Sequence, residues 1–214
     1  MTKTNHQTNL SAVHLRKHMR MQRRSLSHCE RQRSAYLATR FLYKLIPLLP
    51  KKANIGFYLD GFGELPTATI AQFCQKLDYQ AYLPITIPNK PLTFAPIMQP
   101  MKKTPLKKHH LGMYEPRSKL ILSANHMDAI ICPVVMVDLD GVRLGMGGGY
   151  YDRTFAKTKN CLKIAWCYDF QVTDQLPKQP WDMSVDIIIT DQRLIRRNNT
   201  NSSSVNQIAK IKRD

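Results

Sequence analysis

Several features that mark other classes of protein are missing from this 214-residue sequence. No apolar run approaches the roughly 18 residues that a membrane-spanning helix needs, and the longest runs, such as 130–137, have the length of a buried strand. The N-terminus also lacks the apolar segment of a secretory signal. The segment up to Lys44 has Glu30 as its only acid, as in an organellar transit peptide, but its apolar residues recur at core-facing spacing. We therefore expect a soluble, cytoplasmic protein.

Cysteine is scarce as well. The chain has five cysteines, with no C-x-x-C pair and no paired histidine spacing beside them. An odd number without such pairs argues against a disulfide framework and against a zinc site. We expect reduced thiols, buried or idle, in a reducing compartment.

Acidic residues are also few, so the formal net charge is +17. The excess lies mainly in the segment up to Lys44 and in the tail from Arg196. A basic surface attracts nucleic acids, anionic membranes, and phosphorylated or polycarboxylate small molecules. The charge could instead simply solvate helices and tails, since no Lys/Arg block is long and uninterrupted. Residues 11–34 contain no aromatic side chain, whereas single-strand binders usually interleave aromatics with basic residues.

Helical patterns open the chain. Residues 1–10 are polar and are predicted to be disordered, and a basic helix is predicted from about Ser11 to Arg24. Ser27-His-Cys-Glu30 fits the capping box, in which each of the two side chains accepts a hydrogen bond from the other residue's backbone amide. A second helix therefore starts there, and Pro47 stops it.

Short apolar runs then alternate with helical patterns. The predicted strands are 53–59, 81–85, 92–97, 162–166 and 185–190, together with the apolar run 128–137, which is broken by Pro133. The predicted helices are 67–77 and 150–157. Near-continuous apolar runs are typical of strands buried on both faces, so the pattern indicates an α/β protein with a mostly parallel sheet. The proline- and lysine-rich stretch 100–116 is predicted to be a long loop. We expect a single catalytic domain over 11–195 and a basic, disordered tail over 196–214.

The most specific pattern is Asp140-Gly-Val-Arg-Leu-Gly-Met-Gly-Gly-Gly-Tyr-Tyr-Asp152, in which four of the chain's nine glycines fall at Gly145, Gly147, Gly148 and Gly149. Glycine permits positive φ and lets backbone amides close around a ligand, and successive inward-facing amides form an anion site. Arg143 can supply a forked cation to phosphate oxygens, and Asp152 is a hard oxygen ligand for Mg²⁺. The segment therefore predicts a phosphate-handling loop.

Two better-known phosphate loops do not fit this segment. No Gly-Lys-Ser/Thr follows, as a P-loop requires, and Tyr150 stands where a dinucleotide fingerprint has its third glycine. For the glycines alone, a plain flexible turn between two elements remains the alternative.

The run from Arg143 to Arg153, Arg-Leu-Gly-Met-Gly-Gly-Gly-Tyr-Tyr-Asp-Arg, closely resembles the motif of the 5-formyltetrahydrofolate cyclo-ligases, also called methenyltetrahydrofolate synthetases. Further blocks of the family occur in the expected order: Leu15 to Leu26, Phe57 to Thr67, Leu83-Pro84, Glu115-Pro116, Asp128 to Pro133 and Trp181 to Asp186. The resemblance spans about residues 11–192. It implies a three-layer α/β/α fold with a mostly parallel sheet (NagB/RpiA/CoA-transferase-like) and N-terminal helices packed on it.

The resemblance also implies an activity. Family members convert 5-formyltetrahydrofolate, ATP and Mg²⁺ into 5,10-methenyltetrahydrofolate, ADP and phosphate, through phosphorylation of the formyl oxygen. For this chain it implies a monomeric, ATP-dependent carbon–nitrogen ligase of one-carbon metabolism that needs no membrane and no nucleic acid. The folate can carry a polyglutamate tail.

The family's functional positions carry over to four sets of residues. The catalytic set is Arg143, Tyr151 and Asp152. The ATP-binding set is Arg16, Arg143, Leu144, Gly145, Met146, Gly147, Gly148, Gly149, Tyr150 and Tyr151. The folate-binding set is Leu59, Glu64, Met146, Gly147, Gly148, Gly149 and Tyr150. The metal-binding set is Asp152 and Asp186.

Simpler interpretations exist for several of these residues. Arg16 could be solvated on a basic helix, and Leu59 could belong to the core. Glu64 could favour the start of the next helix through its dipole, and Asp186 could be an exposed turn acid. The two tyrosines, at 150 and 151, could be packing aromatics.

The sequence differs from the family pattern at two positions, and two other functions remain as alternatives. Ala12 stands where the family usually has Lys or Arg, and Gly148 stands where some relatives have Lys. The charge and the arginine-rich first helix would also suit an RNA- or DNA-binding protein. A third reading is a divergent member of the same fold that binds another phosphorylated ligand.

Overall fold

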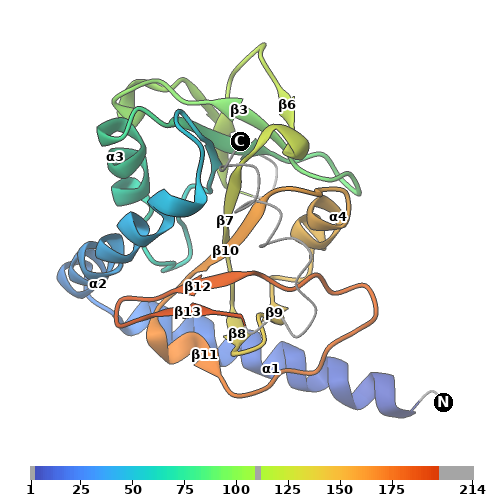
Figure 1. The fold of residues 1–214 in the computed structure, drawn as a ribbon. Helices are drawn as coiled ribbons and strands as arrows, with labels where there is room; N and C mark the ends of the chain where they lie inside the picture. Colours follow the sequence, from blue (N-terminus) through green and yellow to red (C-terminus); the bar gives the residue numbers. More distant parts are fainter. Residues whose placement is uncertain (1–2, 109–111, 198–214) are drawn as a thin grey trace.

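The computed structural model describes residues 3–108 and 112–197 and is built around an eight-stranded sheet (Figure 1). The strand order is β13-β12-β10-β7-β1-β2-β3-β6, in which β12, β10, β7, β1 and β2 run parallel and the other three pair antiparallel at the edges. Their bounds are β1 Asn54–Gly56, β2 Gln80–Ile85, β3 Thr93–Pro96, β6 Leu122–Ser123, β7 Ala129–Pro133, β10 Leu162–Trp166, β12 Ile187–Ile189 and β13 Leu194–Arg196. The predicted mostly parallel sheet is confirmed.

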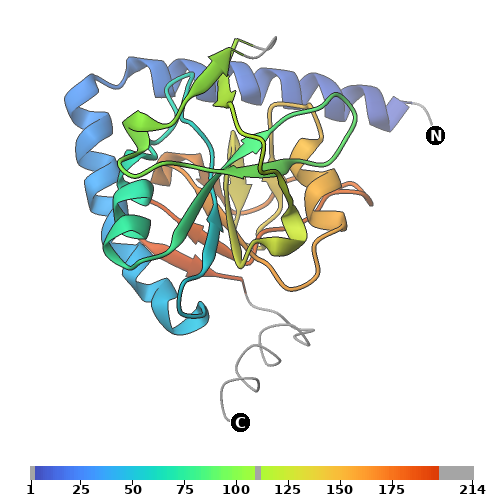
Figure 2. The ribbon, with the colours of Figure 1, turned by 90° about the horizontal axis from the view of Figure 1, so that it is seen from above.

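Helices and a small second sheet cover the two faces of this sheet. Helices α2 (His28–Leu42) and α3 (Ala68–Lys76) lie on one face. Helix α4 (Tyr150–Ala156) and the sheet β11-β8-β9 (Val172–Thr173, Met136–Asp138 and Arg143–Leu144) belong to the other face. Figure 2 shows α2 and α3 on one side and α4 on the other. The predicted three-layer α/β fold is therefore confirmed, while the finer NagB/RpiA-type label stays a prediction.

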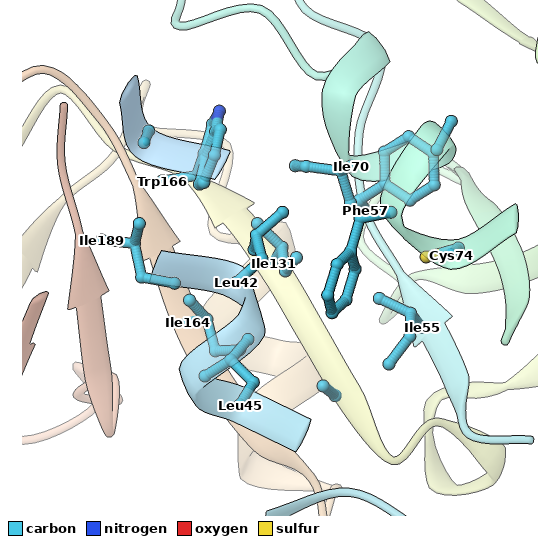
Figure 3. Close-up of a cluster of buried hydrophobic side chains, with 14 of the residues drawn as sticks. Leu42, Leu45, Ile55, Phe57, Ile70, Cys74, Ile131, Ile164, Trp166 and Ile189 are labelled. Atoms are coloured by element: carbon cyan, nitrogen blue, oxygen red, sulfur yellow. The ribbon is translucent and has the colours of Figure 1, made fainter. Parts of the chain in front are cut away.

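The core follows the two-residue period of the strands. On β7, Ile131 faces the cluster under α2 and α3, and its neighbour Ile130 faces the cluster under α4. Figure 3 shows Leu42 and Leu45 reaching from α2 and the following 3₁₀ helix, η1 (Tyr43–Leu48), toward Ile131 and the adjacent strands. Each such side chain contributes about 1.5–3 kcal/mol when fully buried.

The N-terminal helices differ in their positions. The predicted capping box at Ser27 and Glu30 is present and starts α2. Helix α1 covers Lys3–Ser25 and begins eight residues before the expected Ser11, because no proline or glycine interrupts the segment. It does not cover a sheet face as α2 does. It runs along one end of the sheet, as Figure 2 shows, and contacts loops that follow the strands.

Three predicted boundaries were wrong. The expected loop 100–116 contains the 3₁₀ helix η2 (Met101–Lys103) and a hairpin of β4 (Leu106–Lys108) and β5 (Tyr114–Pro116). Every residue of β4 is exposed, so its sequence lacks the apolar alternation that indicates a strand. The run 128–137 does break into two strands, β7 and β8, but Pro133 still belongs to β7 and the gap comes after it. The expected tail starts too early, since Arg196 lies in β13 and the amide of Arg197 donates to the carbonyl of Asp186. Residues 198–214 lie outside the described residues.

The order of the strands creates a crevice beside β1. The chain leaves β1 through α3 to reach β2 on one side, and it leaves β7 through α4 to reach β10 on the other. In open α/β sheets, ligands bind at such a reversal, outside the carboxyl ends of the strands. Within the described ranges, no helix is both long enough and apolar enough to span a bilayer.

Candidate active site

A cavity of about 950 Å³ opens at the carboxyl ends of β1 and β7. Its walls come from Tyr58 and Leu59 after β1, from 133–135 after β7, from α1, and from the glycine loop between β9 and α4. The predicted site residues that line it are Arg16, Leu59, Glu64 and every residue from Arg143 to Asp152. Residues up to 136 positions apart in the chain are thus brought to one cavity of ligand-binding size.

The glycine loop keeps an open backbone on the cavity wall. Gly147 and Gly149 have φ of +97° and +64°, a region that side chains other than glycine disfavour. A Cβ at Gly145 would meet nothing within 4 Å, so space lies directly in front of this residue. The loop therefore presents open backbone at Gly145, while Arg16 lies beside Gly147 and Arg153 beside Gly149. Open backbone flanked by cations suits the predicted phosphate-handling role.

Helix α1 contacts this loop through Arg16. The Nε of Arg16 donates to the carbonyl oxygen of Gly145 at 2.8 Å. Its Nη2 would lie 3.6 Å from a Cβ at Gly147. The simpler interpretation of Arg16 as a solvated surface residue is therefore wrong, because its guanidinium packs along the loop at the cavity wall.

Arg143 and Asp152 join the two ends of the loop. The Nη2 of Arg143 lies 2.9 Å from Oδ1 of Asp152, and the same oxygen accepts the amide of Met183 at 3.2 Å. The Nη1 of Arg143 donates to the carbonyl of Met183, and its guanidinium stacks 4.9 Å above the ring of Phe155. Its side chain is only 4% exposed. Arg143 thus holds Asp152 in place and does not present the open fork that the sequence suggested.

The two tyrosines that begin α4 line the cavity and also pack against the cluster under that helix. Burial raises the pKa of Tyr151 well above its ordinary value. The Tyr151 hydroxyl therefore stays protonated at neutral pH and can donate a hydrogen bond but cannot act as a base.

Glu64 is the acid that the segment after β1 brings to the cavity. Its side chain is 11% exposed and lies 3.9 Å from the Nη1 of Arg23 on α1. Its Oε2 accepts the amide of Gly61 at 3.1 Å. Burial raises the pKa of Glu64 to about 7, against the smaller opposing effects of the Gly61 amide and of Arg23. This carboxyl group can therefore change charge near neutral pH.

Asp186 does not reach this site. It precedes β12, and its Oδ2 accepts the amide of Lys163 at the amino end of β10, at 2.8 Å. The cavity lies at the other end of the parallel strands, and Asp182 lines it instead. Asp152 and Asp186 are thus not brought together in this structure. No group of three or more His, Cys, Asp or Glu side chains in the described ranges forms a ready metal site.

Sequence reasoning missed an apolar part of the wall. Phe62, Met113, Tyr114 and Trp181 line the cavity although each is at least 38% exposed. Large exposed apolar side chains around a cavity mark a binding surface. They come from two separate loops and the β4–β5 hairpin, so no local spacing in the sequence connects them.

Comparisons with known proteins identify the family of this chain. The profile of the 5-formyltetrahydrofolate cyclo-ligase family matches residues 9–191. The 5-formyltetrahydrofolate cyclo-ligase of Haemophilus influenzae is 29% identical over 180 residues, which cover 82% of this chain and 95% of the relative. These matches confirm the predicted family and the predicted ligase class.

Two solved structures are similar over most of the chain. The 5,10-methenyltetrahydrofolate synthetase of Aquifex aeolicus superposes with a TM-score of 0.75 at 29% identity, covering 89% of this chain and 95% of that one. The synthetase of Mycoplasma pneumoniae gives 0.67 at 26% identity, covering 84% and 98%. Sequence, fold and cavity therefore lead to one assignment: the chain belongs to the 5-formyltetrahydrofolate cyclo-ligase family.

Proposed function

We propose that this protein converts 5-formyltetrahydrofolate to 5,10-methenyltetrahydrofolate with consumption of ATP and release of ADP and phosphate, and that it requires Mg²⁺. The observation that carries the proposal is that the open glycine loop, a buried acid and an apolar wall share one cavity. The glycine loop suits phosphates, and the acid and the apolar wall suit a flat heterocycle with a polar edge. A cytoplasmic location and a monomeric state are part of the same proposal.

The reaction needs an activation step. The N5-formyl group is an amide, so its carbon is a poor electrophile and its oxygen is a poor leaving group. We propose that the formyl oxygen attacks the γ-phosphorus of ATP, which breaks the bond to the β-phosphate oxygen and releases ADP. N10 then attacks the activated carbon and loses its proton, and the carbon–oxygen bond breaks to release phosphate. Such phosphoryl transfer depends mainly on positioning and on neutralising charge.

Nucleotide phosphates would bind at the glycine loop. The backbone at 145–149 faces the cavity with no side chain in front of Gly145. Arg16 contributes positive charge from α1. Arg143 supports the site indirectly because its guanidinium is already bonded to Asp152 and Met183.

The residues present fit Mg²⁺ in the way enzymes use it with nucleotides. Mg²⁺ is usually held by one or two carboxylates together with substrate phosphates, without an all-protein cage. Asp152, 30% exposed on the cavity wall, and Asp182 are the acids that would hold it. When bound, Mg²⁺ neutralises charge on the phosphates. Asp186, expected as a second ligand, is assigned no part in this proposal because its carboxylate is bonded at the other end of the sheet.

The folate would lie against the opposite wall. Leu59 and Phe62 supply apolar contact, and Glu64 supplies a carboxylate for the N–H groups on the edge of the pterin ring. A buried carboxylate that accepts such hydrogen bonds discriminates strongly for its partner, because it is costly to leave unpaired.

The test is an absorbance assay. Purified protein with ATP, Mg²⁺ and 5-formyltetrahydrofolate should generate the near-ultraviolet absorbance of the methenyl product, together with one ADP for each product formed. The proposal fails if the absorbance does not depend on both ATP and protein. A salt-sensitive RNA affinity without any folate-dependent ATP consumption would favour the nucleic-acid reading instead.

A further inference from the structure

Arg23 is one of the most deeply buried side chains of the protein, although it is charged. It projects from α1 and is 1% exposed. Its Nε and Nη2 have no hydrogen-bond partner within the described ranges. A guanidinium is rarely buried in this way, because an unpaired buried charge is costly. The cost calls for a role beyond packing.

The charge nearest to Arg23 belongs to Glu64. The Nη1 of Arg23 and the Oε1 of Glu64 are 3.9 Å apart, so the two side chains form an ion pair without a short hydrogen bond. The loop that carries Glu64 is pressed against α1 at Gly63, where a Cβ would come within 3.0 Å of the carbonyl oxygen of Arg23. Gly63 has φ of +76°, so only a residue without a side chain fits there easily. The close approach fixes Arg23 behind Glu64.

We infer that Arg23 is a positioning residue for folate recognition: its buried guanidinium favours the ionised form of the Glu64 side chain and holds that side chain toward the cavity. Arg23 is not among the residues that line the cavity, whereas Glu64 is. Arg23 therefore acts through Glu64. The inference rests on the proposed function in one respect, namely that the ligand met by Glu64 is the folate.

The surroundings of Glu64 make this positive charge necessary. Asp60, in the same loop, repels a second negative charge. Tyr58 and Tyr151 also face this region, and burial raises the pKa of each well above its ordinary value, so both are neutral near pH 7. The hydroxyl of Tyr168 donates to the backbone carbonyl of Glu64 and not to its carboxylate. Two groups oppose protonation of Glu64: first the Gly61 amide that donates to it, and then Arg23, which is the cation of the two. The pKa of Glu64 is about 7 even with their help.

The inference is tested with Arg23→Met, which keeps the length of the side chain but removes its charge. The matched control is Arg24→Met, which removes the same charge from the next, exposed position on α1. Both are assayed for KM and kcat with 5-formyltetrahydrofolate at saturating ATP from pH 6.5 to 9. Arg23→Met should move the acid limb of kcat/KM about one pH unit upward and raise KM for the folate about fivefold at pH 7, because a rise of one unit from a pKa of about 7 lowers the ionised fraction at pH 7 from about one half to about one tenth. Arg23→Lys, which keeps the charge, should restore most of the wild-type profile.

The outcomes separate this inference from the proposed function. An active wild type whose KM and pH profile are unchanged by Arg23→Met would overturn the inference alone. A wild type that neither binds nor converts 5-formyltetrahydrofolate would overturn the proposed function as well. If circular dichroism shows that Arg23→Met is unfolded, Arg23→Gln takes its place with the same expected shift, since it removes the charge and keeps polar hydrogens. An unchanged KM and pH profile in Arg23→Gln would also overturn the inference.

Discussion

The Nη2 of Arg143 and the Oδ1 of Asp152 are joined at 2.9 Å across the base of the glycine loop. Arg143 begins β9, and Asp152 lies in the first turn of α4. The pair therefore closes the loop at both ends, and the amide of Met183 adds a third segment to the same carboxylate oxygen. The loop can stay open toward the cavity because its ends are fixed here.

The substitution Asp152→Asn should reduce activity much more than stability. The amide oxygen can still accept hydrogen bonds from Arg143 and Met183, but the negative charge is lost. We expect kcat to fall about 100-fold or more, because one charge acting on a phosphoryl transfer is removed. The free energy of unfolding should fall by about 1–2 kcal/mol. The absorbance assay and urea unfolding measure the two effects.

The control for this substitution is Asp140→Asn, an exposed acid three residues before Arg143. It should leave both quantities close to wild type. If Asp152→Asn loses stability in proportion to activity, Asp152 has only a structural role.

The part of the site that could be predicted from sequence is the part that is local. The glycine loop carries its glycines, its arginine and its acid within one short segment, so composition alone indicated an anion site. The capping box at Ser27 was equally local and is present. The strand 162–166 was predicted to the residue, because a buried strand of a parallel sheet is nearly all apolar and only Lys163 departs from that pattern here.

What the sequence could not reveal depends on how distant segments pair. Asp186 is placed at the amino end of the sheet by the register of β12 on β10, in which Ile187 lies beside Ile164. No local pattern fixes that register. Trp181 and Tyr114 carried no local signal of a binding role, and they lie exposed on the cavity wall because distant segments of the chain meet there. In the sequence, Arg23 is one of many arginines in a basic helix. Only the structure shows that Gly63 and Glu64 pack against it.

Gly147→Ala should weaken nucleotide binding through the backbone. At φ of +97° an alanine is strained, by about 1–2 kcal/mol. Its Cβ would make only an ordinary contact with Arg16, at 3.6 Å, so the effect cannot come from a clash. The loop should relax away from the open arrangement, and KM for ATP should rise about tenfold.

Gly112→Ala is the matched control for this change. Gly112 has φ of +83° and no atom within 4 Å of a Cβ, so the substitution adds similar strain between β4 and β5. It should lower the melting temperature by a similar amount and leave KM for ATP unchanged. Equal effects of both alanines on KM would show that general destabilisation, and not the loop, determines nucleotide binding.

Glu64→Gln should remove a pH dependence of stability. The pKa of Glu64 is raised from 4.5 to about 7 in the folded protein, so the folded state binds this proton more tightly than the unfolded chain does. Stability is therefore lost as pH rises from about 4.5 to 7, by about 3 kcal/mol in total. Urea unfolding at pH 5 and pH 8 should show this decline in the wild type and a much smaller one in the variant.

Glu30→Gln is the control for this titration. Its hydrogen bonds from Ser27 lower the pKa of Glu30, so this acid is ionised in both states between pH 5 and 8 and contributes no slope there. The control should keep the wild-type decline. Parallel stability curves for the wild type and Glu64→Gln would contradict the raised pKa of Glu64.

Arg16→Met should raise KM for ATP with little change in KM for the folate. Ala12, Leu15 and Arg16 are the residues by which the described part of α1 lines the cavity, so Arg16 is the cation that this helix brings to the wall. Loss of one phosphate contact should raise KM for ATP about tenfold, and it should also flatten the dependence of that KM on salt.

Lys17→Met removes the same charge from the adjacent, exposed position and should change neither quantity. If the two variants raise KM for ATP equally, the basic helix acts through its overall field and Arg16 makes no specific contact. A rise confined to Arg16→Met would identify α1 as the wall against which the phosphates bind.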